Sequence, residues 1–206
     1  MTSASESSRS ATTSIPVPHR LAPDAVGPRV EFTWQGDRYA HVISGSDDEA
    51  ASRWCSHEGS PNEDWPSSAA IQQLSTEAIE GRETILGVGC CGTTHFSVSV
   101  QHEKLDDDSL ALRFDWAARL SKPLQSSKVD PEGDNPTDAF LGSTYQPRRD
   151  DSTSASDLRT LEFESLGDAM LDKPPSNDTT QIRPGQITGS RTIVWSYRVR
   201  LYPPID

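Results

Sequence analysis

Two runs of alternating apolar and polar residues in the middle of the chain predict a pair of antiparallel strands. In the first run, Phe96, Val98 and Val100 alternate with polar residues over 95–101. In the second, apolar residues recur at every second position over 110–116. Side chains along a strand point to opposite faces in turn, so each run predicts a strand buried on one side. The polar segment 105–109 between them predicts a hairpin loop.

Similar patterns elsewhere predict an all-β protein. The further segments with strand character are Val30–Ile43 (a hairpin), 71–79, 84–86, 158–166 and 192–201. Residues 71–79 also fit a helical stripe, but we favour a strand because Glu80-Gly81 suits a hairpin turn. About seven or eight strands result, which predicts an antiparallel β-sandwich or an open barrel with long irregular insertions.

Long polar segments separate these strands. Residues 1–27 are rich in Ser, Thr and Pro, and we expect a disordered tail because so little apolar surface cannot offset the entropy of ordering. Residues 28–206 are expected to form a single β domain. Within it, the sequence predicts a long acidic loop over 44–70, a flexible insertion over 122–157 and irregular structure over 168–189.

Composition and charge narrow the range of partners. The chain has 206 residues, of which 33% are hydrophobic, and its net charge is −12. A surplus of acid argues against nucleic acid and against anionic membrane surfaces, because both need clustered Lys and Arg. The predicted strands nevertheless carry five arginines, which leaves a local cationic face open. They are Arg113, Arg119, Arg191, Arg198 and Arg200.

Several sequence features bear on the compartment. The first 20 residues lack the basic start and apolar stretch of a signal peptide, and no segment reaches the roughly 18 apolar residues of a membrane helix. Three cysteines, two of them adjacent, do not suggest a disulfide framework. We therefore expect a cytoplasmic protein.

Residues Gly87–Gly92 match the pattern G-x-G-x-x-G of dinucleotide-binding loops. Such a loop needs a helix after it, because the helix N-terminus holds the pyrophosphate. Here residues 93–100 alternate like a strand, so the glycines predict a bend or bulge between paired strands. The acidic runs 47–49 and 106–108 lack the spacing of a calcium loop. No cofactor is expected.

Four residues contain the side-chain types of a zinc site or of a thiol nucleophile with its base: Cys90, Cys91, His95 and His57. Their spacing is unfavourable, because neighbouring strand residues point to opposite faces and four residues along a strand span about 13 Å. A metal site is therefore not expected. These residues define the alternative to a binding protein, a metal- or thiol-dependent enzyme.

The polar face of the central hairpin offers a candidate binding patch. Parity allows two registers, with Val100 opposite either Leu112 or Leu110. In both, three polar side chains gather on the outer face: His95, Arg113 and Asp115.

The sequence thus predicts a β-sandwich interaction or binding module without a catalytic role. A protein or a carbohydrate is the expected partner. Trp54 and Trp65 lie in the acidic loop, where tryptophans stack on sugars in some sandwiches but more often anchor the loop.

Overall fold

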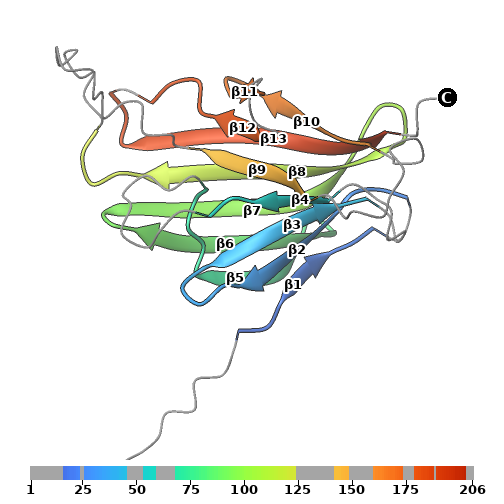
Figure 1. Cartoon of the computed structure of the whole chain (residues 1–206), viewed down its shortest axis with the longest axis horizontal. Helices are drawn as coiled ribbons and strands as arrows, with labels where there is room; N and C mark the ends of the chain where they lie inside the picture. The colour runs from blue at the N-terminus through green and yellow to red at the C-terminus, as the bar shows by residue number, and fades with distance from the viewer. Residues whose placement is uncertain are drawn as a thin grey trace, which may run out of the picture.

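The computed structural model describes residues 16–23, 26–45, 53–58, 68–123, 142–148, 160–173, 179–187 and 189–202. Within these residues the chain forms thirteen strands and no helix. The strands make two antiparallel sheets that lie face to face without closing into a barrel (Figure 1). The prediction of an all-β sandwich is confirmed. No helix in the described part of the chain could span a membrane.

The larger sheet contains seven strands in the order β1-β2-β3-β4-β9-β12-β11. Their bounds are β1 His19–Leu21, β2 Arg29–Trp34, β3 Tyr39–Ser44, β4 Arg53–Ser56, β9 Ser143–Arg148, β12 Thr180–Arg183 and β11 Met170–Asp172. The smaller sheet has the order β10-β13-β8-β7-β6-β5. Its bounds are β10 Thr160–Leu166, β13 Thr192–Tyr202, β8 Leu110–Arg119, β7 Thr94–Lys104, β6 Arg82–Cys91 and β5 Gln73–Ile79.

The ambiguous segment 71–79 forms a strand, β5, over residues 73–79. Glu80 and Gly81 have φ values of 52° and 77°. Two positive φ angles are typical of a type I′ turn, whose twist matches that of the paired strands. The β5–β6 hairpin therefore forms at Glu80-Gly81 as predicted. The segment is a strand rather than a helix because the turn brings β5 beside β6, where the two strands pair.

The central hairpin forms over the predicted segments, but both predicted registers are wrong. Lys104 pairs with Leu110, so residues 105–109 make a five-residue loop. Val100 consequently lies opposite Phe114. The loop length decides the register, and the prediction had counted only the parity of the two strands.

Five short strands lie in segments that the hydrophobic pattern did not predict as strands. β1 lies within the predicted tail, β4 within the acidic loop, β9 within the predicted insertion, and β11 and β12 within the irregular segment. For these strands the prediction was wrong. Short strands carry too few alternating positions to stand out in a sequence. The remaining parts of these segments fall largely outside the described residues, as does Trp65.

The inner faces of the two sheets enclose an aromatic core. Trp116 of β8 stacks on Trp195 of β13, with ring centroids 5.9 Å apart. Trp54 of β4 points inward and meets Phe163 of β10 at 5.3 Å. Trp54 is therefore an anchor of the core rather than a loop residue that could stack on a sugar.

The glycines of the G-x-G-x-x-G segment make room for a neighbouring chain segment. Gly87 and Gly89 lie within β6, next to the buried residues Ala70 and Ile71. A Cβ on Gly89 would come within 2.2 Å of the Ala70 carbonyl oxygen, and one on Gly87 within 2.9 Å of Ile71. The prediction of a bend or bulge is wrong for Gly87 and Gly89, which pair regularly within β6, while Gly92, with a φ of 56°, lies in the turn between β6 and β7.

Candidate anion-binding site

Arginines from neighbouring strands line up across the outer face of the seven-stranded sheet. Arg29 of β2 lies opposite Ser44 of β3, which lies opposite Arg53 of β4. Arg53 in turn lies directly opposite Arg148 of β9. Three arginines and one serine therefore form a single row perpendicular to the strands.

A second row adds one more arginine and the one carboxylate among the described residues that line the pocket. Arg20 of β1 lies opposite Glu31 of β2, and Glu31 lies opposite Val42 of β3. These side chains face outward because the alternate residues of the same strands, such as Val30 and Ile43, are buried in the core.

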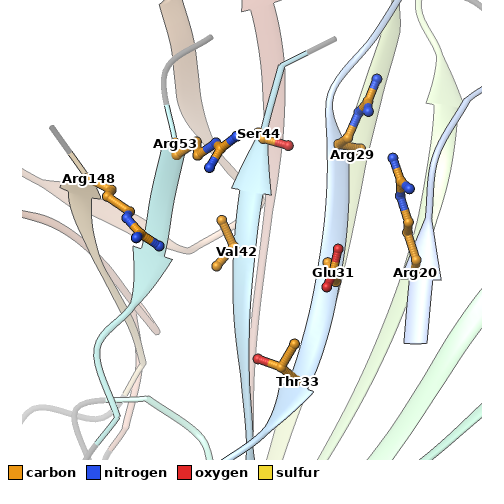
Figure 2. A pocket seen from close by; sticks show the side chains of 8 residues that line it. All are labelled: Arg20, Arg29, Glu31, Thr33, Val42, Ser44, Arg53 and Arg148. Carbon is orange, nitrogen blue, oxygen red and sulfur yellow. The ribbon is translucent and has the colours of Figure 1, made fainter. Parts of the chain in front are cut away.

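The two rows enclose a shallow pocket of about 310 Å³. Figure 2 shows its lining, with Val42 and Ser44 of β3 between arginines on either side. The lining residues are Arg20, Arg29, Glu31, Thr33, Val42, Ser44, Arg53 and Arg148. With four guanidinium groups and one carboxylate, the pocket has a formal charge of +3, although the whole chain carries −12.

The arrangement of the arginines is unfavourable for the folded protein by itself. Like charges directly opposite each other on neighbouring strands destabilise a sheet, and Arg53 faces Arg148 in this way. Among the described residues, neither Arg20 nor Arg53 forms an ion pair. Guanidinium groups gathered on one face suit an oxyanion, because each presents its N–H donors as a planar fork.

The outer face of the six-stranded sheet is different, because carboxylates neutralise three of its arginines. Three arginines there each have a carboxylate oxygen within 2.9 Å: Arg113 with Asp115, Arg198 with Glu164 and Arg200 with Asp107. Three of the five arginines that had left a cationic face open thus form ion pairs with carboxylates instead. Among the described residues, the four arginines that line one pocket lie on the other sheet.

The polar patch predicted on this face is not assembled. His95 lies opposite Arg119, whereas Asp115 lies opposite Ser99. Arg113 Nε donates to Asp115 at 2.9 Å, and Ser196 Oγ donates to the same carboxylate at 2.7 Å. The expectation that His95 joins Arg113 and Asp115 was wrong, because the five-residue loop shifts His95 four positions along β8 from Asp115.

The four cysteine and histidine candidates do not come together at one place, although two of them, Cys90 and His95, lie opposite each other. Cys90 is exposed and pairs across the strands with His95, whereas Cys91 is buried on the inner side of β6. His57 follows β4 in the other sheet, where its Nδ1 lies 3.2 Å from Gln146 Nε2. Within the described residues, no group of three or more His, Cys, Asp or Glu side chains could hold a metal ion.

A chain of hydrogen bonds crosses the core between the two sheets. His41 Nε2 of β3 lies 2.7 Å from the Tyr145 hydroxyl of β9, which bonds to the Tyr197 hydroxyl of β13. Trp116 Nε1 donates to Tyr197 at 3.1 Å. Burial lowers the pKa of His41 to about 3 and raises the pKa of Tyr197 to about 12. The side chains of this hydrogen-bond network are therefore uncharged at neutral pH, and the network joins the two sheets within the buried core.

A second buried polar group lies next to β4. Glu58 Oε1 accepts a hydrogen bond from Ser56 at 2.5 Å, while its Oε2 is buried and has no hydrogen-bond partner. Burial is the main cause that raises the pKa of Glu58 to about 7. Arg38 is 2% exposed and donates to Asp37 at 3.0 Å. Asp37 is exposed, so this pair joins a buried guanidinium to a surface carboxylate, and neither residue lines the arginine pocket.

The sequence analysis did not predict the arginine pocket. The alternation in Arg29-Val30-Glu31-Phe32 does indicate that Arg29 faces outward. Arg53 and Arg148, however, lie in short strands that read as loop and insertion, 95 positions apart. Comparisons with protein-family models, with curated proteins and with solved structures find no match for this chain.

Proposed function

We propose that this protein is a binding module whose ligand is a small anionic molecule held in the arginine pocket. The observation that carries the proposal is the row Arg29–Ser44–Arg53–Arg148, which concentrates positive charge on one face of an acidic protein. A bound phosphate or carboxylate would relieve the repulsion between Arg53 and Arg148 and accept charge-assisted hydrogen bonds from them.

The chemistry of the pocket favours binding over catalysis. Guanidinium groups stay protonated and cannot act as bases, and the described residues that line the pocket include no histidine that could activate Thr33 or Ser44. The alternative of a metal- or thiol-dependent enzyme has less support, because Cys90 and Cys91 point to opposite sides of β6.

The size of the pocket and the charge of the chain favour a small ligand. A volume of about 310 Å³ lies at the lower end of the range of small-molecule sites. Long polyanions such as nucleic acids would experience the repulsion of the whole chain with its charge of −12. The partner class predicted from sequence, a protein or a carbohydrate, fits this site where it carries a phosphate, sulfate or carboxylate group.

Isothermal titration calorimetry with inorganic phosphate at low ionic strength tests the proposal. We expect Arg53→Gln to weaken phosphate binding by about tenfold to a hundredfold, because a hydrogen bond to a charged group contributes about 1.5–3 kcal/mol. The matched control is Arg198→Gln, which removes a guanidinium held by Glu164 on the other sheet. Equal phosphate affinity in the wild type and Arg53→Gln, or no binding by the wild type, would refute the proposal.

A further inference from the structure

We infer that the ligand of the arginine pocket carries two anionic groups, one on each side of β3. This inference rests on the proposed function and adds the chemical class of the ligand. The arginines fall into two pairs, Arg20 and Arg29 on β1 and β2, and Arg53 and Arg148 on β4 and β9. β3 lies between the pairs and contributes no charge.

The spacing of the strands sets the distance between the two pairs. Neighbouring strands lie about 4.8 Å apart, so the backbones of β2 and β4 are separated by roughly 10 Å. Figure 2 shows the guanidinium group of Arg53 extending toward Ser44, while Arg20 and Arg29 lie on the far side of β3. A single small anion cannot fill both halves, whereas a molecule with an anionic group at each end can.

The centre of the pocket suits an uncharged linker. Val42 offers an apolar surface and Ser44 a hydroxyl group, and both lie on β3 between the two pairs of arginines. A chain of methylene or hydroxymethylene groups can therefore cross β3 without burying a charge.

The two halves differ in charge. Glu31 shares the first half with Arg20 and Arg29, which leaves that half with a formal charge of +1. The half with Arg53 and Arg148 carries +2. The first half therefore suits a carboxylate, and the second suits a carboxylate or a phosphate.

A series of dicarboxylates from malonate to sebacate tests the inference by calorimetry, each compared with the monocarboxylate of the same chain length. Affinity should rise to a maximum at one length and then fall, because a tether works best when it matches the distance between its two sites. At the maximum we expect the dicarboxylate to bind about tenfold or more tightly than its monocarboxylate.

Variants in each half show whether one ligand occupies both. Arg20→Gln and Arg53→Gln should each reduce the best dicarboxylate to the affinity of the monocarboxylate, while Arg198→Gln leaves it unchanged. Thermal unfolding establishes that each variant is folded. If phosphate binds but dicarboxylates never exceed their monocarboxylates, the two-group ligand is refuted and the proposed function stands. If phosphate and the carboxylates all fail to bind, both are refuted.

Discussion

Replacing Arg53 by glutamine should stabilise the protein in the absence of ligand. Arg53 faces Arg148 directly across two paired strands. Two unit charges between about 5 and 10 Å apart in water repel each other by about 0.8 to 0.4 kcal/mol. Favourable cross-strand pairs contribute about 0.2–1 kcal/mol, and like charges directly opposite each other are destabilising. Glutamine keeps part of the aliphatic stem, so the change removes mainly the charge.

A gain of this size is measurable. For a chain of this length, about 1 kcal/mol shifts the thermal midpoint by about 2–4 °C, so Arg53→Gln should melt about 1–3 °C higher than the wild type. Urea unfolding in a buffer free of polyvalent anions gives the free energy directly. The gain should shrink in 1 M salt, where the Debye length falls to about 3 Å.

The control lies on the other sheet. Arg198 donates to both oxygens of Glu164, at 2.7 and 2.9 Å, and the two residues are also directly opposite each other. Arg198→Gln removes an attraction in the same geometry and should cost up to about 1 kcal/mol. The reasoning fails if Arg53→Gln destabilises the protein, or if its gain is as large in 1 M salt as in dilute buffer.

Three further changes address the core. Gly89→Ala should destabilise by about 2 kcal/mol or more in urea unfolding, because the new Cβ would lie 2.2 Å from a backbone oxygen; an unchanged midpoint would contradict the packing. Tyr145→Phe should cost about 1–3 kcal/mol by leaving buried hydrogen-bonding groups unpaired, without changing phosphate binding. Glu58→Gln should gain stability relative to the wild type as pH rises from about 4.5 to 7. Burial raises the pKa of Glu58 to about 7, so the wild type loses the stabilising, protonated form of this carboxyl group over that window. A difference in stability between the two proteins that does not change with pH would contradict this.

The strands that could be predicted are those in which burial and alternation coincide. β7, β8 and β13 each bury every second residue over long stretches, so period two is visible without any structure. β9 is different, because Ser143, Thr144 and Tyr145 are all buried although two of them are polar. Pro147 also argues against a strand, yet it is tolerated because β12 pairs only with residues 143–145.

The candidate site could not be predicted because it depends on pairing rather than on pattern. Arg53 and Arg148 are neighbours only because β4, which pairs with β3 on one side, pairs with β9 on the other, and the sequence alone does not reveal β9 as a strand. The sequence pattern left open a cationic face on the long strands instead, and there three arginines each form an ion pair with a carboxylate.

The charge of a sheet face therefore depends on which residues lie opposite each other in each row across the strands. The same residue type stabilises the six-stranded sheet, where Glu164 lies opposite Arg198, and places like charges opposite each other in the seven-stranded sheet, where Arg148 lies opposite Arg53. Under the proposed function, an anion bound between these like charges would stabilise the native state, because a ligand that binds only the native state shifts the unfolding equilibrium by a free energy that grows with the logarithm of its concentration over its Kd.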